Sequence, residues 1–326
     1  MSDFAVVYGK QNVRHILTEA IVDLSWSSNR EEISRTMTAR LRDIPPIQTA
    51  GKFMCFAKRT KEQLMHAKNQ FFHGPIIDYD QNEFTNEWEL QVREIGWYLA
   101  KNKGTRPYLK GPAGDELQKY IKSTGIDFRC PSLNFSIDAR YGTIHHSEVV
   151  LDVLQKAYEH TGYRFYLEYI RTDQGYAVVV TREGTNTRVP VFVREQMEAS
   201  SSGESIEETY TVVTTQKWKD DKMVSSVTKV NAGAVNNLGR MEEIIEVEEN
   251  EDPATVADKR LVGLSNPKKT KKITVKHSDH TICGLRAGWL VLIQEQTYKS
   301  KWVVVSEQTV FKNDMYTVQM ELERRE

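Results

Sequence analysis

The sequence has few cysteines, no long apolar run and no excess of either charge. Its three cysteines stand far apart among 326 residues, which fits neither a disulfide framework nor a zinc pattern and is typical of a reducing compartment. Apolar runs reach only five residues, as at residues 4–8, whereas a membrane span needs about 20. Charged residues such as Asp3 and Lys10 also argue against a secretory leader. We therefore expect a protein made in a cytoplasm that does not act on a membrane.

The charge balance also limits the partners of the chain. Lys and Arg number 44 against 45 Asp and Glu, so no global field is available to hold nucleic acid. The composition is 39% hydrophobic and 10% aromatic, which excludes wholesale disorder. At about 150 residues per domain, the length indicates two or three folded domains.

The first hundred residues are patterned mainly as strands. Residues 4–8 and 51–57 are short apolar segments, and Trp88, Leu90 and Val92 alternate with polar residues, as on a half-buried strand. Residues 33–41 fit both a strand and a helix, but their threonines and the prolines at 45 and 46 favour a strand. Residues 61–70 are polar and rich in helix formers, and we expect an excursion between strands there.

The middle of the chain changes to helical spacing. Residues 115–124 carry apolar residues on one helical face and precede Gly125. Residues 147–161 form the clearest predicted helix, with Ser147 as its expected N-cap and Gly162 as its stop. Alternating apolar residues over 163–169 and 176–180 predict a hairpin packed against it.

The last part returns to strands. Residues 199–203, Ala-Ser-Ser-Ser-Gly, are predicted as a linker or long loop. Residues 210–215 and 223–230 flank a polar turn, as in a hairpin. Asp252 and Pro253 open a predicted helix that runs to residue 264. Four strands are expected at 272–276, 289–294, 302–310 and 316–323.

No group of residues has the spacing of a catalytic, cofactor or metal site. The phosphate-binding, dinucleotide-binding, zinc-protease and serine-hydrolase motifs are all missing. His145 and His146 lack the spacing of helical metal ligands, and His277 with His280 is only a weak zinc pattern. Cys283 lies in an apolar segment, where a buried thiol is the default. We therefore assign no catalytic residue, no cofactor and no metal ligand.

Two oppositely charged segments lie close together in the sequence. Residues 242–252 are strongly acidic, and residues 268–272 hold four lysines. These segments are either solvated loops or edges, or complementary surfaces of a contact between subunits. The basic run is too poor in aromatics to indicate nucleic-acid binding.

The order of the segments resembles that of the baseplate hub proteins of contractile phage tails and phage-tail-like bacteriocins, most closely the group found in PBSX-like prophages. The matching segments are Asp23-Leu24-Ser25-Trp26-Ser27 before the strand at 33–41, Phe72-His73-Gly74-Pro75-Ile76, Tyr98-Leu99-Ala100-Lys101-Asn102, the helix-Thr-Gly-strand unit at 148–165, Leu238-Gly239-Arg240-Met241, and the closing segments Trp302-Val303-Val304-Val305 and Met320-Glu321-Leu322. Residues 61–70 depart from the family pattern as an insertion.

The resemblance implies an α+β, β-rich fold with two small tail-tube-like β-barrels around an α/β middle region. The expected divisions are an N-terminal barrel at 1–102, a mixed region at 103–200 and a C-terminal barrel at 201–326 with a helical excursion near 253–264. Three copies would then place six barrels in a ring. Such a ring matches a hexameric tail tube on one side and a trimeric spike on the other.

The function implied by the resemblance is structural and not enzymatic. The chain would be a homotrimeric hub that joins the tail tube protein to the spike protein and contacts other baseplate proteins, with the tape measure protein as a further candidate partner. It would lie in the baseplate of a virion or tail-like particle that is assembled in a bacterial cytoplasm. The alternatives are a tail-tip cell-wall hydrolase and a cell-wall glycan-binding module, for which Trp218 on its polar turn is the candidate platform.

Overall fold

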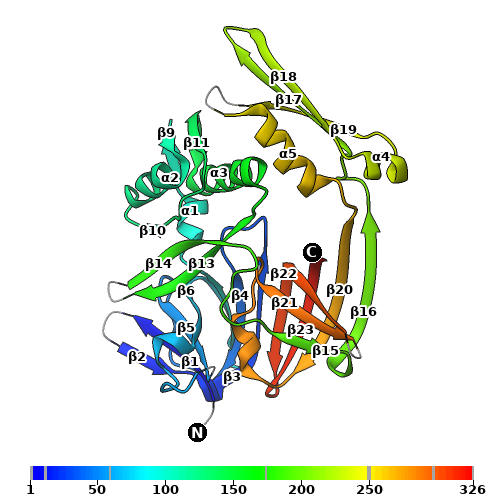
Figure 1. The fold of residues 1–326 in the computed structure, drawn as a ribbon. Coiled ribbons are helices and arrows are strands. Elements are labelled where there is room, and N and C mark those ends of the chain that lie inside the picture. The colour runs from blue at the N-terminus through cyan, green and yellow to red at the C-terminus, as the bar shows by residue number, and fades with distance from the viewer. Residues whose placement is uncertain are drawn as a thin grey trace.

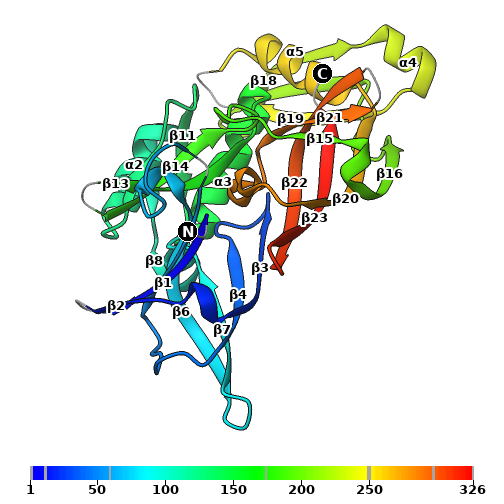
Figure 2. The ribbon, with the colours of Figure 1, turned by 90° about the horizontal axis from the view of Figure 1, so that it is seen from below.

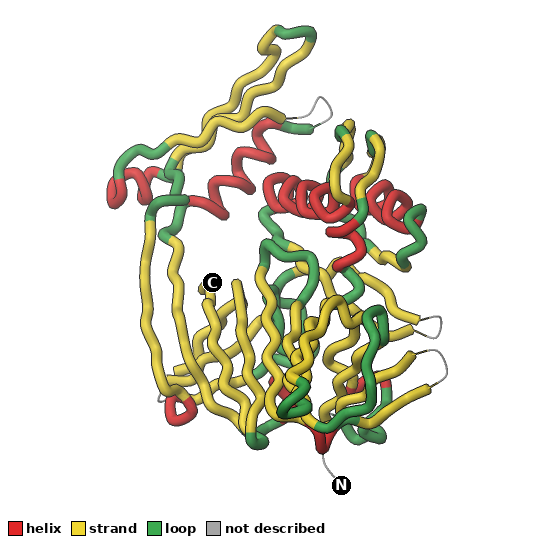
Figure 3. The backbone as a smooth tube through the Cα atoms, turned by 180° about the vertical axis from the view of Figure 1, so that it is seen from behind, coloured by secondary structure: helices red, strands yellow, loops and turns green. Residues whose placement is uncertain are grey.

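The computed structural model describes residues 3–10, 13–58, 60–172, 175–247, 251–295 and 298–324. Strands hold 53% of the residues and helices 20%, so the chain is a β-rich α+β protein, as the sequence predicts. Most strands form one end of the molecule, and helices α2, α3 and α5 lie together at the other end (Figure 1). The same two layers are seen from behind in Figure 3.

The N-terminal region is built from strands. Their bounds are β1 (Phe4–Lys10), β2 (Val13–Ile16), β3 (Ile21–Asn29), β4 (Thr36–Arg42), β5 (Lys52–Ala57), β6 (Gln70–Asn82) and β7 (Glu87–Arg93), with short 3-10 turns η1 (Thr18–Ala20) and η2 (Ala67–Asn69). In β4, Met37, Ala39 and Leu41 are buried while Thr36 and Thr38 are not. A period of two settles residues 36–42 as a strand. Residues 61–69 hold the turn η2, and Gln70 begins β6.

The middle region mixes helices with short strands. Its elements are α1 (Trp97–Lys101), β8 (Lys103–Thr105), β9 (Tyr108–Pro112), α2 (Ala113–Lys122), β10 (Asp127–Arg129), β11 (Ser136–Arg140), β12 (Thr143–His145), α3 (His146–Thr161), β13 (Phe165–Thr172), β14 (Gly175–Arg182), β15 (Val191–Val193) and the turn η3 (Arg194–Gln196). Helix α3 ends at Gly162, whose φ of 70° is the left-handed conformation that stops a helix. The predicted N-cap is wrong, because His145 takes that position and makes no side-chain cap, leaving Ser147 inside the helix.

The C-terminal region contains the predicted hairpin, helix and four strands. Its elements are β16 (Met197–Ser205), β17 (Val212–Lys219), β18 (Lys222–Val230), α4 (Ala232–Leu238), β19 (Glu242–Val247), α5 (Pro253–Leu264), β20 (Lys268–His277), the turn η4 (His280–Gly284), β21 (Leu290–Glu295), β22 (Tyr298–Lys312) and β23 (Met315–Arg324). The Asp252 carboxylate accepts a hydrogen bond of 3.0 Å from the Thr255 amide, which confirms the predicted start of α5. Residues 248–250 of the acidic segment lie outside the described residues.

The predicted linker at residues 199–203 is wrong. These residues lie inside strand β16, which pairs antiparallel with β20 from Met197 to Ser205. Serine and glycine have little intrinsic preference for strands, but a ladder uses only the backbone N–H and C=O groups. The long strand β20 therefore holds this segment in an extended conformation, and tertiary pairing overrides local composition.

A sheet of 13 strands joins the two ends of the chain. Eight of its strands follow in the order β16-β20-β23-β22-β3-β4-β7-β6, and β22 pairs with β3 across the chain. Figure 2 shows the blue N-terminal strands beside the red C-terminal strands. Among the described residues the path of pairings stays open, so neither expected barrel is closed by hydrogen bonds within one copy.

Two large apolar cores support the two layers. The first core lies against the large sheet and combines Trp26, Phe53 and Phe72 with Tyr316 and Val318. The second core lies beneath the helical layer and is formed mainly by α2, α3 and the hairpin β13–β14. Because the first core draws on both ends of the chain, the N-terminal and C-terminal strands are held together by apolar burial as well as by strand pairing.

Candidate assembly surface

One face of the eight-stranded sheet is lined by small polar side chains. Leu24, Trp26 and Met37 point into the core, so Ser25 and Ser27, one position along, point to the opposite face. The register then places uncharged residues beside one another in rows across neighbouring strands. One row is Thr274, Gln319, Gln308, Ser27 and Thr36 and continues to Arg93, and the next is Thr317, Val310, Ser25, Thr38 and Gln91 and lies between Lys276 and Asp78.

Within these rows, side chains of neighbouring strands form hydrogen bonds with one another. The Ser27 and Thr36 hydroxyl oxygens lie 3.0 Å apart, and the Thr38 hydroxyl donates to Gln91 Oε1 at 3.2 Å. Because these polar groups already pair with one another, the face presents a wet surface of low charge to any ligand. Such a surface is suited to weak contacts and not to specific capture.

Some of the charged residues on this face form ion pairs near the strand ends. Arg40 lies 3.1 Å from Asp23, and Lys272 lies 3.7 Å from Glu321. Exposed pairs of this kind contribute only about 0–1 kcal/mol to stability. Their main effect is to leave little net charge on the face.

The eight-stranded sheet has a free rim at each end of its order. Within the described residues, β16 pairs only with β20, and residues 78–82 of β6 pair only with β7. Strand β16 runs along one margin of the molecule in Figure 1, and none of its last eight residues is buried. An uncovered strand edge carries unpaired N–H and C=O groups and is a template for another strand.

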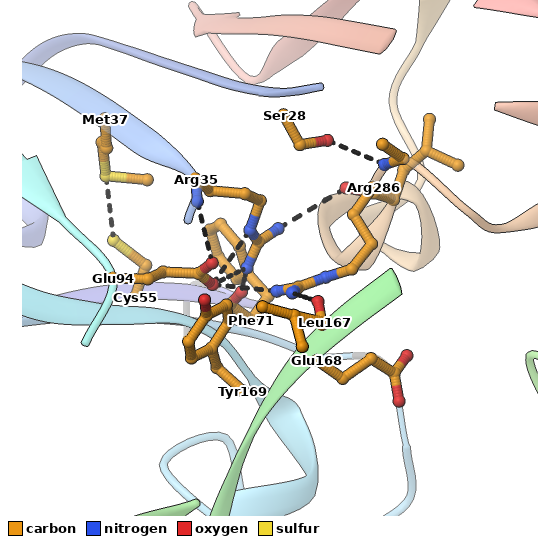
Figure 4. Close-up of polar contacts among 12 residues, drawn as sticks. Ser28, Arg35, Met37, Cys55, Phe71, Glu94, Leu167, Glu168, Tyr169 and Arg286 are labelled. Carbon is orange, nitrogen blue, oxygen red and sulfur yellow. Dashed lines mark hydrogen bonds and ion pairs between the residues drawn. The ribbon is translucent and has the colours of Figure 1, made fainter. Parts of the chain in front are cut away.

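A buried charge cluster fixes the end of this sheet to the rest of the chain (Figure 4). Arg35 precedes β4, Glu94 follows β7, and Arg286 lies between η4 and β21. Glu94 Oε1 lies 2.8 Å from both Arg35 Nη2 and Arg286 Nη2. The Arg35 and Glu94 side chains are only 2% and 1% exposed, so this contact lies in a region of low dielectric.

Backbone carbonyl groups complete the cluster. Arg286 Nη1 donates to the carbonyl of Leu167 at 2.8 Å, and Arg35 donates to the carbonyl of Phe71. The Tyr169 hydroxyl donates to the carbonyl of Ile33. The cluster therefore joins the N-terminal strands, the hairpin β13–β14 and the C-terminal loop after η4.

The electrostatics of the cluster follow from burial and pairing. Burial by itself raises the pKa of Glu94, but Arg286 and Arg35 outweigh it and hold that pKa below its usual value. At Glu307 on β22, the neighbouring positive charge and hydrogen bonds do not outweigh the effect of burial. Burial raises the pKa of Glu307 to about 7, although Arg35 and the hydroxyl groups of Thr309 and Ser28 oppose the shift.

The sequence analysis did not single out any of these charged residues. A signal was available in the alternation of the strands. Arg35 stands two positions before Met37 and Glu94 two positions after Val92, so both fall on the alternate positions that are otherwise apolar and face the core. Glu307 likewise shares the buried parity of Thr309 on β22. A charged side chain on the buried parity of a strand has to find a partner inside the protein.

The lysines at residues 268–272, which the sequence did single out, lie on β20 of this sheet, whereas the predicted histidine, cysteine and tryptophan candidates lie apart from the polar face. His146 Nδ1 lies 2.6 Å from the Tyr120 hydroxyl, and His280 Nδ1 lies 2.5 Å from the Tyr316 hydroxyl. Cys283 is fully buried. Trp218 lies near the tip of the projecting hairpin β17–β18 and is 42% exposed. Over the ranges that the structure covers, no three His, Cys, Asp or Glu residues are arranged to hold a metal ion.

Membrane insertion by a helix finds no support in the described part of the chain. None of its helices combines the length and the apolar character required to cross a bilayer.

Known proteins with this fold are found among phage tails. The tail protein from Neisseria meningitidis MC58 superimposes with a TM-score of 0.66 at 14% identity, covering 99% of this chain and 97% of that one. The 43 kDa tail protein of prophage MuSo2 from Shewanella oneidensis gives 0.62 at 12% identity, with 98% of each chain covered. Prophage tail protein gp18 from Listeria monocytogenes EGD-e gives 0.63 at 10% identity, covering 99% and 95%.

The sequence comparisons add a family match. The family described as YQBQ-like matches residues 24–323, whereas no curated protein matches the sequence. The structural likeness shows that the chain has the fold of phage tail proteins, in agreement with the resemblance in its sequence.

Proposed function

The chain belongs to the YQBQ-like family, and from this premise we propose that it is the structural hub of a contractile tail or tail-like particle. Three copies form a ring that receives the tail tube protein on one side and holds the spike protein on the other. The hub carries mechanical load and lines a channel, and it catalyses no reaction. It is a component of the baseplate, assembled in the host cytoplasm.

The observation that carries this proposal is the open sheet with one free rim at each end. All seven pairings from β16 to β6 are antiparallel, so the first and the eighth strand run in opposite directions. Rotation about an axis along the strands therefore brings β16 of one copy beside β6 of the next in antiparallel orientation. Repeated contacts of this kind close into a ring and leave no edge exposed.

The arrangement within one copy supports a ring built from three chains. The junction of β22 with β3 divides the eight strands into two groups of four, one from each end of the sequence. In this proposal, residues 1–102 and 201–326 are two barrel-like domains that neighbouring copies complete, and residues 103–200 are the region between them. Three chains then present six similar units, which suits a hexameric tube as well as a trimeric spike.

The polar face is the proposed lining of the channel. Its central rows of serine, threonine and glutamine allow nucleic acid or a tape measure protein to pass without strong binding, since the charges of both signs lie toward the ends of the rows. The helical layer and the strand ends remain for contacts with the spike and other baseplate proteins. The likeness of the fold to three phage tail proteins supports this assignment.

Deletion of the gene in the organism that produces the particle tests the proposal. We expect tails to be missing or to lack a joined tube and spike, and a plasmid copy to restore them. Labelled antibody should mark one end of the tail in electron micrographs. Normal tails after deletion, or label along the whole tube or sheath, would overturn the assignment.

A further inference from the structure

A cleft lies between the end of the large sheet and the helical layer. It has a volume of about 1080 Å³ and is formed by the β3–β4 connection, α3, the start of β13, α5 and the start of β20. Nine Arg and Lys residues line it against six Glu residues, so its lining is cationic. A space of this size holds a ligand or a few residues of a peptide.

Arginines and tyrosines stack on one another along one wall of the cleft. The guanidinium carbon of Arg164 lies 3.8 Å from the centre of the Tyr158 ring, and that of Arg260 lies 5.4 Å from the same centre. The guanidinium carbon of Arg182 lies 3.4 Å from the centre of the Tyr163 ring. Stacking fixes the planes of the guanidinium groups and leaves their N–H edges available.

Two of these arginines make no direct ion pair, although the charge of Arg164 acts on the nearby carboxylates of Glu183 and Glu323 and favours their ionised forms. Arg260 is held by both carboxylate oxygens of Glu243 at 3.0 Å. By contrast, among the residues that the structure describes, the guanidinium groups of Arg164 and Arg182 form no ion pair and no hydrogen bond. The Nε of Arg182 is shielded from solvent and still lacks an acceptor, and a buried donor without an acceptor is costly.

The rest of the lining indicates what the missing acceptor belongs to. Leu151, Leu154 and Val262 give the cleft an apolar wall, and Val262 is 75% exposed. Glu31 and Glu207 also line the cleft and would repel a ligand with a negative charge on every unit, such as a nucleic acid. A peptide segment that combines one or two carboxylates with apolar side chains can pair with the arginine wall and pack against the apolar wall of the cleft.

We propose that this cleft binds a short acidic peptide segment of another protein of the particle. A carboxylate of the segment accepts hydrogen bonds from Arg164 and Arg182, and its apolar side chains pack against Leu151, Leu154 and Val262. Ion pairs of guanidinium with carboxylate are favourable because two parallel hydrogen bonds form at once. The proposal does not depend on ring closure, since the cleft lies within a single copy.

Binding of synthetic peptides to the full-length protein tests the inference. The probes are short, overlapping, fluorescently labelled peptides that cover the tail and baseplate proteins encoded beside this gene, and the readout is fluorescence anisotropy. We expect at least one acidic peptide to bind. Its affinity should fall about tenfold for Arg164→Glu and for Arg182→Glu, because each removes a charge-assisted pair.

The matched control is Arg171→Glu, which changes an exposed arginine of the same hairpin outside the cleft. It should bind the peptide as the wild type does. If a charge-reversal variant, Arg164→Glu or Arg182→Glu, fails to fold, the neutral variant Arg164→Gln or Arg182→Gln replaces it. The neutral variants should also weaken binding of the peptide. The inference is overturned if no peptide binds, if the cleft variants bind unchanged, or if a single-stranded oligothymidine binds more tightly than every peptide.

Discussion

At the scale of single residues, the molecule depends on charged side chains that lie where a strand pattern calls for apolar ones. Arg35 and Glu94 adjoin the ends of two neighbouring strands, β4 and β7, and Arg286 reaches them from the C-terminal region. Such a cluster is costly to desolvate, and its geometry repays that cost only when every partner is present. The cluster therefore acts as a junction that tolerates the loss of no member.

Glu94→Gln tests this view of the junction. The substitution removes the carboxylate that contacts both buried guanidinium groups, and it should lower the free energy of unfolding by about 3 kcal/mol or more. Urea unfolding followed by circular dichroism measures the change. Glu89→Gln, at an exposed position on the strand β7 that Glu94 follows, is the control and should change stability by less than about 0.5 kcal/mol. Equal effects at both positions would refute the role of the junction.

Glu307 predicts a dependence of stability on pH. Burial raises its pKa from 4.5 to about 7 in the folded protein, so the folded state keeps a proton that the unfolded chain releases between these two values. The contribution of Glu307 to the free energy of unfolding is thus fully present below pH 4.5 and is lost as the pH rises toward about 7.

Glu307→Gln should therefore flatten the pH profile of stability between those values and make the protein more stable than the wild type at neutral pH. Glu321→Gln, whose side chain is 41% exposed, should keep the slope of the wild type. Chemical denaturation across a series of buffers gives both profiles. A slope that persists in Glu307→Gln would assign the pH dependence to another group.

At the scale of elements, the sequence predicts what local pattern and capping determine. Helices α3 and α5 were predicted close to their observed bounds, because a stripe of apolar residues, a terminal glycine and an Asp-Pro start are all local signals. The N-cap of α3 was missed, since a serine near a helix start looks the same whether it caps or not. Strand β16 was missed because only its pairing with β20 makes it a strand.

The candidate surface was also hidden from sequence analysis for a physical reason. Which serines and threonines share a face depends on the register of β22 against β3, a contact between residues more than 270 positions apart. The buried junction gives only a weak signal in the sequence, namely charged residues at strand positions that otherwise alternate as apolar. Only a chain whose topology is known reveals that Arg35, Glu94 and Arg286 meet.

A proline scan of β16 tests its role as an open rim. In an antiparallel pair, the N–H groups of successive residues point alternately toward the partner and away from it. Of Ser200→Pro and Ser201→Pro, one should remove a bond to β20 and destabilise the single copy. The other should leave its thermal stability nearly unchanged and abolish assembly of copies, as measured by size-exclusion chromatography with light scattering. Two variants that both assemble normally would exclude β16 from the contact.

At the scale of the whole molecule, the tip of the projecting hairpin β17–β18 points away from the large sheet (Figure 1). Trp218 therefore belongs to a different surface from the proposed ring contact. We expect Trp218→Ala to leave the assembly of copies unchanged in mass photometry. If the variant instead loses binding to purified cell wall while the wild type binds, the glycan-binding alternative gains direct support.

The eight-stranded sheet has a rim at each end that is paired on one side only, and the proposed hub depends on those two rims meeting in neighbouring copies. Electron cryo-microscopy of the baseplate in the intact particle measures this directly. The account predicts three copies around the channel, with β16 of each beside residues 78–82 of the next and the rows of serine and glutamine facing the lumen. Any other number of copies, or three copies in contact through other surfaces while both rims face solvent, would contradict it.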